Sequence, residues 1–491
     1  MLDVLLGGPM NAPATGPLYE RVADRLQGLV DQGTLRPGER LPSVRRLHKQ
    51  WGVSVSTVLE AYRLLEDRGL LEVRPQSGHY VRPSRVRLPE PRPERGPTRP
   101  RPIDQNDLMV RVTMRAGPAG LVRLGCGLPD RSLLPIQALD RTIARVARRH
   151  ADSQDYTVSP GHPILRRVLA ARLIDAGCTL AADELVITNG CQEALELCLR
   201  VVTEPGDAVL VESPTYFGLL EIMKSLRLRA VEVPGRAGVG VDVDAVERAL
   251  GQDRIAAVVL SANYTNPLGA LVPDDSKARL VRLCSKHNVP LIEDDAYGEL
   301  GFSGERPRVL KAWDTDGTVL CCGTLSKTLS PGLRVGWVAP GRWFDAVARQ
   351  KMVTTLGSPT IPQLAAADFL RDGGYDRHLR KMRRVHRDRV ARMSAVVSEA
   401  FADGTRMSRP LGGQFLWIEL PEGVDAIEVF EAAWDAGISV APGPMFSPSG
   451  GYRRFLRLNC SVPWGDDVVE AVHTLARIVS DRLQDPNAPP A

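Results

Sequence analysis

Gly323-Thr-Leu-Ser-Lys-Thr-Leu-Ser-Pro-Gly-Leu-Arg-Val-Gly-Trp337 is the stretch that decides the fold of this 491-residue chain. Lys327 follows the apolar run Val319–Cys322 and a cluster of hydroxyl residues, and Arg334 comes later, past a Pro-Gly turn. A lysine buried among small polar groups loses its proton near neutral pH, as an amine that forms a Schiff base must do. The planar fork of an arginine suits a phosphate dianion. The stretch therefore predicts a reactive amine beside a phosphate site.

Short apolar runs alternate with helical segments over most of the chain that follows residue 105. Such runs are typical of buried parallel strands, and the helices between them cover both faces of the sheet. The pattern predicts an α/β domain of three layers (α/β/α) with a smaller carboxy-terminal subdomain. The expected strands of the sheet are Leu185–Thr188, Ala208–Val211, Ala256–Leu260, Pro290–Ile292 and Val319–Cys322, and those of the subdomain are Gly413–Glu419 and Arg454–Leu458.

The composition is that of a globular protein. Hydrophobic residues make up 43% of the chain, and the net charge of +5 is too small by itself to indicate a nucleic-acid partner. No apolar run is long enough to span a membrane, and Met1–Gly8 lacks the features of a signal peptide. The eight cysteines form no Cys-x-x-Cys pair, so we expect reduced thiols, a cytoplasmic location and no metal site.

The arginine-rich first hundred residues follow a different pattern. Apolar residues at helical spacing, with serines placed as caps, predict three helices, and a short hairpin with its tip at Gln76–Gly78 comes after them. The expected helices are Leu18–Val30, Val44–Trp51 and Val55–Arg68. This is the plan of a winged helix-turn-helix, a DNA-binding fold. Residues 83–105 then alternate proline with arginine and predict an extended, semi-rigid and solvated tether.

The lysine stretch closely resembles the lysine segment of fold-type I pyridoxal phosphate enzymes of the aminotransferase family, S-x-S-K-x-x-x-P-G-x-R-x-G. The resemblance implies that pyridoxal 5'-phosphate forms an aldimine with Lys327, close to Arg334 and to Thr324, which replaces the first serine of the family. A second segment of the family, a turn that opens a helix, cups the cofactor phosphate. Its counterparts here are Asn189, Gly190 and Cys191.

Other loops at strand ends match the same family. Tyr216 of the E-S-P-T-Y stretch corresponds to an aromatic residue over the pyridine ring, and Asn266 of the N-P-x-G turn to an amide on the phenolic oxygen. The L-I-E-D-D-A-Y stretch leads from a strand into carboxylates, whose burial is costly without a cation. By the family's D-x-x-Y spacing, the resemblance implies that Asp294 keeps the ring nitrogen protonated and that Tyr297 reaches the phenolic oxygen, with Asp295 as the alternative to Asp294.

Two more residues follow from this resemblance. Tyr156 lies in a Y-x-x-x-x-G-x-x-x-L-R segment, where the family's tyrosine reaches across a dimer interface to the phosphate of the other subunit. Arg457 lies inside an apolar strand, where the family's arginine binds a substrate α-carboxylate in bidentate fashion. Together with Lys327, Asp294 and Tyr297 as expected catalytic residues, they imply a homodimeric pyridoxal phosphate protein.

The strings G-x-L-x-P-G-x-x-L-P-S-V-R and V-S-x-S-T-V-x-x-A-Y-x-x-L-x-x-x-G-L closely resemble the DNA-binding domain of the GntR family. The resemblance implies contacts of the second and third helices with phosphates and major-groove base edges, and of the hairpin with the minor groove. The residues so implied are Arg45, Ser54, Ser56, Thr57, Ser77 and Gly78. Many relatives have an arginine at the position of Val55. A valine cannot hydrogen-bond a guanine as that arginine would, but it can still make an apolar contact with a thymine methyl group.

The order of these parts closely resembles the MocR family of bacterial transcription regulators, over nearly the whole chain. We expect a winged helix-turn-helix in residues 12–82, a linker in 83–105 and an aminotransferase-like domain in 106–485. The resemblance implies a head-to-tail, domain-swapped homodimer that binds double-stranded operator DNA and senses an amino compound, or pyridoxal phosphate itself. A working aminotransferase with an incidental DNA-binding domain is the main alternative. A module that has lost the cofactor is disfavoured, since every cofactor position holds a suitable side chain.

Overall fold

The computed structural model forms two compact units. The first comprises Met1–Leu88 with Ala391–Ala400, and the second comprises Pro89–Val390 with Phe401–Ala491. The residues that the structure describes are 17–31, 34–35, 38–68, 70–74, 78–81, 88–94, 96–97, 99–103, 108, 111–112 and 120–484.

The described residues of the smaller unit before residue 82 form three helices and an antiparallel hairpin, which confirms the predicted winged helix-turn-helix. Ser43 and Ser54 each accept a hydrogen bond from the backbone N–H three residues on, and so cap the second and third helices. Buried apolar side chains around Trp51 and Tyr62 form the core. The elements are α2 (Leu18–Asp31), α3 (Val44–Trp51), α4 (Val55–Asp67), β1 (Leu71–Arg74) and β2 (Gly78–Val81).

A nine-stranded sheet forms the centre of the larger unit, in the order β3-β7-β6-β9-β10-β11-β12-β5 with β8 paired to β7. The five strands predicted from the sequence run in one direction, and β12 lies antiparallel between β11 and β5. The sequence did not predict β12 because its Gly-Trp start interrupts the apolar run. The strands are β3 (Arg101–Pro102), β5 (Val186–Thr188), β6 (Ala208–Ser213), β7 (Arg229–Arg236), β8 (Gly240–Val241), β9 (Ile255–Leu260), β10 (Leu291–Asp294), β11 (Val319–Thr324) and β12 (Gly336–Ala339).

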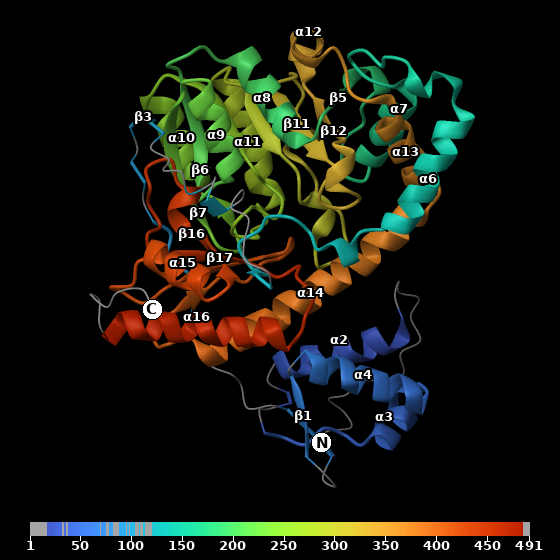
Figure 1. Cartoon of the computed structure of the whole chain (residues 1–491), viewed down its shortest axis with the longest axis vertical. Coiled ribbons are helices and arrows are strands. Elements are labelled where there is room, and N and C mark those ends of the chain that lie inside the picture. Colours follow the sequence, from blue (N-terminus) through green and yellow to red (C-terminus); the bar gives the residue numbers. More distant parts are fainter. Residues whose placement is uncertain are drawn as a thin grey trace. The chain divides into compact units, whose positions relative to one another are not determined.

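Helices cover both faces of this sheet, which confirms the three-layer arrangement (Figure 1). Neighbouring residues of one strand pack on opposite layers: Val209 and Val211 of β6 lie in one core cluster and Leu210 lies in the other. One layer contains α8 (Cys191–Val202), α9 (Phe217–Ser225) and α12 (Phe344–Thr355). The other contains α7 (Pro163–Leu173), α10 (Val243–Gln252), α11 (Asp274–Lys286) and α13 (Thr360–Arg371), with α6 (Ile136–Arg149) packed beside α7 and α13.

The carboxy-terminal subdomain is built on a four-stranded antiparallel sheet, which the sequence predicted in part. Its order is β13-β14-β17-β16, and Arg457 of β17 lies opposite Trp417 of β14. The elements are α14 (Gly374–Ala400), β13 (Arg406–Met407), β14 (Phe415–Glu419), α15 (Ala426–Asp435), β16 (Ala441–Pro442), β17 (Phe455–Asn459) and α16 (Asp466–Gln484), and β15 (Ile438–Ser439) pairs with β4 (Val122–Arg123).

The described part of the proline- and arginine-rich segment is bound along the larger unit, so the prediction of a solvated tether is wrong. The backbone N–H of Arg92 donates to Glu419 Oε2 over 2.8 Å, and Glu94 Oε2 accepts from the backbone N–H of Tyr452 over 2.6 Å. Further along, β3 extends the edge of the sheet beside β7. The composition showed the lack of apolar side chains, but an extended chain can also be held by backbone hydrogen bonds and carboxylates.

No helix in the described residues is long and apolar enough to cross a membrane. The same residues contain no group of three or more His, Cys, Asp and Glu side chains arranged to hold a metal ion.

Candidate functional site

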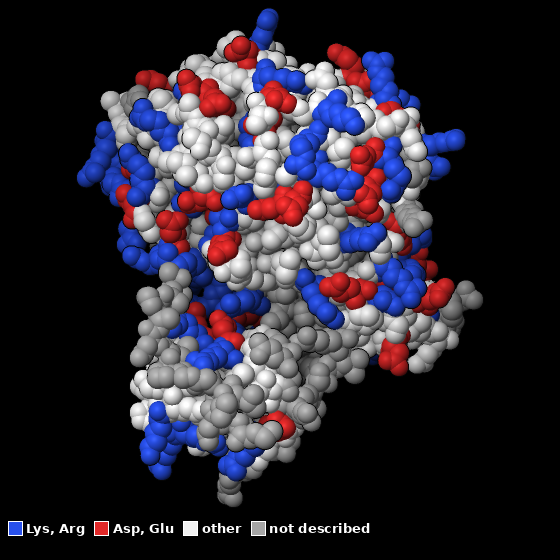
Figure 2. Space-filling view, turned by 180° about the vertical axis from the view of Figure 1, so that it is seen from behind, with Lys and Arg blue, Asp and Glu red and all other residues white. Residues whose placement is uncertain are grey.

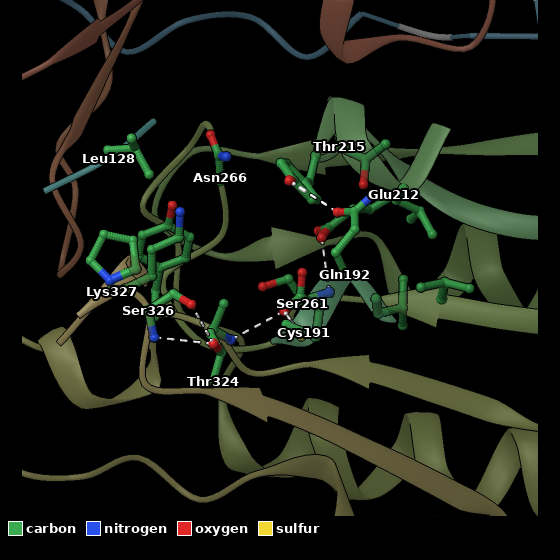
Figure 3. Close-up of a pocket in the computed structure, with 18 of the residues that line it drawn as sticks. Leu128, Cys191, Gln192, Glu212, Thr215, Ser261, Asn266, Thr324, Ser326 and Lys327 are labelled. Atoms are coloured by element: carbon green, nitrogen blue, oxygen red, sulfur yellow. Dashed lines mark hydrogen bonds between the residues drawn. The ribbon is translucent and has the colours of Figure 1, made fainter. Parts of the chain in front are cut away.

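A cavity of about 200 Å³ lies at the carboxyl ends of β6, β9, β10 and β11 (Figure 3). Parallel strands end at one edge of a sheet, so loops that are far apart in the sequence meet there. Eight of the residues predicted for the cofactor line this cavity. They are Cys191, Tyr216, Asn266, Asp294, Tyr297, Thr324, Lys327 and Arg334.

Lys327 follows the end of β11 and presents its amine to the cavity. The amine Nζ donates to Gly127 O over 3.1 Å and lies 5.7 Å from the centre of the Tyr297 ring. Burial, and after it the positive charge of Arg457, lower the pKa of the Lys327 amine to about 8. A sizeable share of this amine is therefore neutral near physiological pH, as a nucleophile requires.

Arg334 reaches from a left-handed backbone position (φ 52°) to the start of α8. Its Nη2 donates to Asn189 O over 2.7 Å, and a Cβ built on Gly190 would lie 2.5 Å from the same nitrogen. Only glycine leaves room for the guanidinium there. The Ser326 hydroxyl lies 3.0 Å from that of Thr324 and 3.5 Å from Arg334 Nη1. A guanidinium, two hydroxyls and a helix start form a site suited to a phosphate.

Asn189 lies behind this site rather than in the cavity wall. Its backbone N–H and its amide donate to the Glu193 carboxylate over 2.6 and 3.2 Å. Glu193 in turn pairs with the fully buried Lys351 over 2.7 Å. The Asn189 side chain therefore stabilises the turn before α8. The sequence predicted a contact with the phosphate for this residue and did not predict its bond to Glu193.

The two neighbouring aspartates have different surroundings. Asp294 lines the cavity and accepts hydrogen bonds from the Cys191 thiol and the Ala296 backbone N–H, both over 3.2 Å. Burial raises the pKa of the Asp294 carboxyl, and these two donors oppose the rise. Asp295 instead forms a buried ion pair with Arg306 and also accepts from an asparagine. Of the two aspartates, therefore, Asp294 is the one whose carboxylate faces the cavity.

Polar aromatic residues and an amide complete the cavity wall. The Tyr216 hydroxyl donates to Gln192 Oε1 over 3.2 Å, and Tyr297 packs edge-on against Phe415 at 5.6 Å between ring centres. Burial raises the pKa of Tyr216 to about 12 and also raises that of Tyr297, so both phenols keep their protons at neutral pH. Asn266 also lines the wall.

Arg457 is fully buried in the middle of β17. Its Nη1 donates to Asn266 Oδ1 over 3.0 Å and its Nη2 to Gly125 O over 2.6 Å, while its Nε has no partner. The guanidinium carbon lies 4.3 Å from the centre of the Phe415 ring. No carboxylate of the described residues pairs with it, and burial lowers its pKa to about 10. The protein thus buries a cation whose hydrogen-bond acceptors are all neutral.

Glu212 is a cavity residue to which the sequence analysis gave no role. One carboxyl oxygen accepts from Ser261 N over 2.9 Å, and the other is buried without a partner. Burial raises the Glu212 pKa to about 8; the Ser261 N–H opposes this rise, and the charge of Asp294 adds to it. The available signal was a glutamate at the end of an apolar strand, the same pattern that pointed to Asp294.

Tyr156 lies outside the cavity of its own chain, with 86% of the residue exposed. In the same loop, Val158 forms an isolated bridge to Gly357, next to the carboxyl end of α12. Val158 is 50% exposed, and Val353 on that helix is 72% exposed. The loop and the end of the helix thus both expose apolar side chains.

The predicted DNA-contacting residues that the structure describes lie in the smaller unit. Arg45 is exposed on α3, and Ser54, Ser56 and Thr57 form the start of α4. Gly78 opens β2 with φ 107°, where a side chain is strained. Ser77 lies outside the described residues.

The cavity fits pyridoxal phosphate in each of its chemical parts. A neutral amine suits an aldehyde, a carboxylate suits a pyridine nitrogen, and the Gly190 position keeps free the space that a Cβ would fill beside Arg334. Aromatic and amide side chains line the space between these groups.

Comparisons with known proteins agree with this fit. Residues 121–474 match the aminotransferase class I and II family, and residues 18–81 match the bacterial regulatory proteins of the gntR family. The crystal structure of LysN, the α-aminoadipate aminotransferase of Thermus thermophilus complexed with N-(5'-phosphopyridoxyl)-L-leucine, has a TM-score of 0.70. It shares 29% sequence identity and covers 74% of this chain and 94% of its own.

Two bacterial proteins are similar over nearly their whole length. The HTH-type transcriptional regulator YjiR of Escherichia coli is 37% identical over 462 residues, which is 94% of this chain and 98% of that protein. The probable rhizopine catabolism regulatory protein MocR of Rhizobium meliloti is 26% identical over 88% of each chain.

The fold, the cavity and the two matched families define a pyridoxal phosphate-dependent, DNA-binding transcriptional regulator. More narrowly, the chain belongs to the MocR family, in which a GntR-type helix-turn-helix domain precedes an aminotransferase class I and II domain.

Proposed function

We propose that the larger unit binds an amino compound with a carboxylate, and that this binding changes the affinity of the smaller unit for operator DNA. Arg457 carries the proposal. A fully buried guanidinium without a carboxylate partner among the described residues is costly, and an acidic ligand removes that cost. The effector is therefore an amino acid or a close relative.

Different residues of the cavity would bind different parts of the cofactor. Arg334, Ser326, Thr324 and the start of α8 at Gly190 and Cys191 would hold the phosphate. Tyr216 would pack against the ring, Asp294 would bind its nitrogen, and Asn266 and Tyr297 would bind its phenolic oxygen. When bound, pyridoxal phosphate supplies an aldehyde that exchanges between primary amines. Lys327 is the resident amine, and its lowered pKa keeps a share of it neutral, as an amine that would bond to that aldehyde must be.

The effector carboxylate enters between Arg457 and its present acceptors. Asn266 Oδ1 gives up its bond to Nη1, because a bidentate carboxylate makes stronger, charge-assisted bonds with a guanidinium than a neutral amide does. The Asn266 amide would then be available to the phenolic oxygen of the cofactor. The carboxylate thus changes the contacts between β17 of the subdomain and a loop of the large sheet.

The loop of residues 446–452 connects this change to the linker. The centre of the Phe446 ring lies 5.0 Å from the Arg457 guanidinium carbon, and the Phe446 carbonyl accepts from the Thr215 N–H over 2.9 Å at the cavity. At the other end of the loop, the Tyr452 N–H donates to Glu94 of the linker. A shift of Arg457 toward a ligand therefore moves a loop that holds the segment leading to the DNA-binding domain.

A second copy of the chain completes the proposed regulator. The patch of exposed apolar residues formed by Tyr156, Val158, Met352, Val353 and Leu356 is the surface for a homodimer of the larger units. Tyr156 then reaches the phosphate site of the partner, and the head-to-tail arrangement brings two DNA-binding domains to paired half-sites. Elsewhere, Figure 2 shows acidic and basic side chains interspersed over one face of the larger unit, as on an ordinary soluble surface.

One experiment tests the effector proposal directly. The cofactor-loaded dimer is titrated with a panel of amino acids and amines while its absorbance and its binding to the DNA beside its own gene are followed. We expect one amino acid to change both signals, and Lys327→Ala to lose both responses. Lys286→Ala, an exposed lysine at the end of α11, is the control and keeps them. A DNA response that persists in Lys327→Ala contradicts the proposal.

A working aminotransferase is the second candidate, because Lys327, Asp294, Tyr297 and Arg457 together are the groups that transamination needs. Conversion of the bound cofactor to its amine form by an amino acid alone, with release of the keto acid, supports it. A third candidate, a sensor of the cofactor itself, predicts that apo and loaded protein bind the operator differently without any amino compound.

A further inference from the structure

Helix α4 of the smaller unit carries two exposed apolar side chains one turn apart. Val55 is 41% exposed and Leu59 is 40% exposed. The opposite face of the helix forms the domain core, with Val58, Ala61, Tyr62 and Leu65 buried. Val55 and Leu59 therefore form a strip that the fold of the domain does not require, and we refer to this pair as the apolar strip.

The polar groups near the strip are occupied within the helix. The Ser54 hydroxyl accepts from the Thr57 N–H over 3.1 Å and lies within 2.8 Å of the hydroxyls of Ser56 and Thr57. Further along the exposed face, Arg63 lies 3.7 Å from Glu60. The first turns of α4 thus offer a DNA groove the methyl groups of Val55 and Leu59 beside these hydroxyls.

We infer that Val55 and Leu59 read the 5-methyl groups of two nearby thymines in the major groove of the operator. The inference rests on DNA binding by this domain and specifies the bases that it selects. Thymine is the base with a methyl group on its major-groove edge, and apolar side chains pack against that methyl. Arg45 and Lys49, exposed on the preceding helix, supply charges for the flanking phosphates.

The spacing of the strip agrees with this assignment. Four residues of an α-helix rise by about 6 Å, whereas one base-pair step of duplex DNA rises by about 3.4 Å. Two side chains one helical turn apart therefore meet methyl groups within roughly two base pairs of each other. Basic residues beside the strip favour a polyanion over an apolar protein partner.

Replacement of thymine by uracil tests the inference, because it removes the methyl group and nothing else. The full-length, cofactor-loaded chain first selects duplexes from a randomised library, and each thymine of the selected site is then replaced singly. We expect uracil to weaken binding by about threefold to fivefold at the contacted positions. Val55→Ala and Leu59→Ala should each weaken binding to the thymine duplex and abolish the uracil effect at one position.

Controls separate the inference from DNA binding itself. Leu18→Ala removes a 38% exposed leucine from α2 and should keep the full uracil effect. Uracil that binds as well as thymine at every position, or equal uracil effects in the wild type and both variants, would overturn the inference and leave DNA binding intact. Failure to select any duplex would refute DNA binding as well. If Leu59→Ala changes the oligomeric state of the protein in solution but not its base preference, the strip is a protein contact. That result also overturns the inference.

Discussion

The Cys191 thiol donates a hydrogen bond to Asp294 Oδ1 over 3.2 Å, and so the first residue of α8 is joined to the last residue of β10. Burial, and then the charge of Asp294, raise the pKa of this thiol well above its ordinary value. The thiol therefore stays protonated and acts as a donor. It satisfies a buried carboxylate that faces the cavity and ties the phosphate end of the site to the end for the ring nitrogen.

Removal of this donor should weaken the apo-protein. Cys191→Ala leaves the buried Asp294 carboxyl with one partner fewer, so we expect the free energy of unfolding of the larger unit to fall by about 1–3 kcal/mol. Cys191→Ser keeps a donor of similar reach and should lose less. Denaturant unfolding of the cofactor-free variants measures the difference. Equal losses in the two variants would assign the effect to sulfur packing instead of hydrogen bonding.

Arg457 should decide whether the effector needs a carboxylate. A charge-assisted, bidentate bond contributes about 1.5–3 kcal/mol, so Arg457→Met should weaken binding of the effector by roughly 10-fold to 100-fold. The same variant should bind the decarboxylated amine as well as the wild type does. Absorbance titrations of the two proteins with the acid and with its amine provide the four affinities. If Arg457→Met weakens binding of both compounds equally, the arginine has no specific contact with the carboxylate.

The sequence predicted the fold and most of the cavity because each strand ended in a loop of distinctive chemistry. The choice between Asp294 and Asp295 was open, since both follow the same apolar run. Arg306 decides between them, because it forms an ion pair with Asp295. No local sequence pattern predicts that pair. The bond between Asn189 and Glu193 could not be predicted either, because it depends on the conformation of the turn before α8.

The linker was misjudged for a related reason. Composition reports whether side chains can form a core, and the segment before residue 103 has few that can. Its anchoring instead depends on Glu94 and on backbone groups whose partners lie more than 300 residues away in the sequence. The proposed role of Tyr156 is a further case, because the structure of one chain cannot place a contact with a second copy.

Glu212 should make the stability of the apo-protein depend on pH, and a single substitution should remove this dependence. The folded-state pKa of about 8 lies above the ordinary value, so between these two pH values the folded protein holds a proton that the unfolded chain has lost. The contribution of Glu212 to stability is therefore fully present in acid and is lost as the pH rises through about 8.

Glu212→Gln mimics the protonated carboxyl at every pH. Relative to this variant, the wild type should lose up to about 4 kcal/mol of unfolding free energy between about pH 5 and pH 8. Urea unfolding of both apo-proteins at these two pH values measures the loss. Parallel pH profiles would show that Glu212 is already ionised in the folded state. Glu221→Gln, at a half-buried position of α9, controls for a change of net charge.

Loss of the contact between Glu94 and Tyr452 should leave effector binding intact and remove the effect of the effector on DNA affinity. Glu94→Ala removes the acceptor that ties the linker to the loop beside the effector arginine, and it leaves every residue of the cavity in place. The absorbance change with the effector should therefore keep its midpoint. The change in DNA affinity, about 5-fold to 150-fold for an ordinary allosteric coupling, should fall toward none.

Two variants make this test specific. Glu94→Gln keeps an acceptor for the Tyr452 N–H and should restore most of the DNA response. Glu90→Ala should behave as the wild type does, because the contact of Glu90 with Arg406 uses its backbone carbonyl, which the substitution retains. DNA affinity is measured by fluorescence anisotropy with and without saturating effector. An unchanged response in Glu94→Ala would mean that the signal reaches the DNA-binding domain by another route, since the loop then moves without acting on the linker.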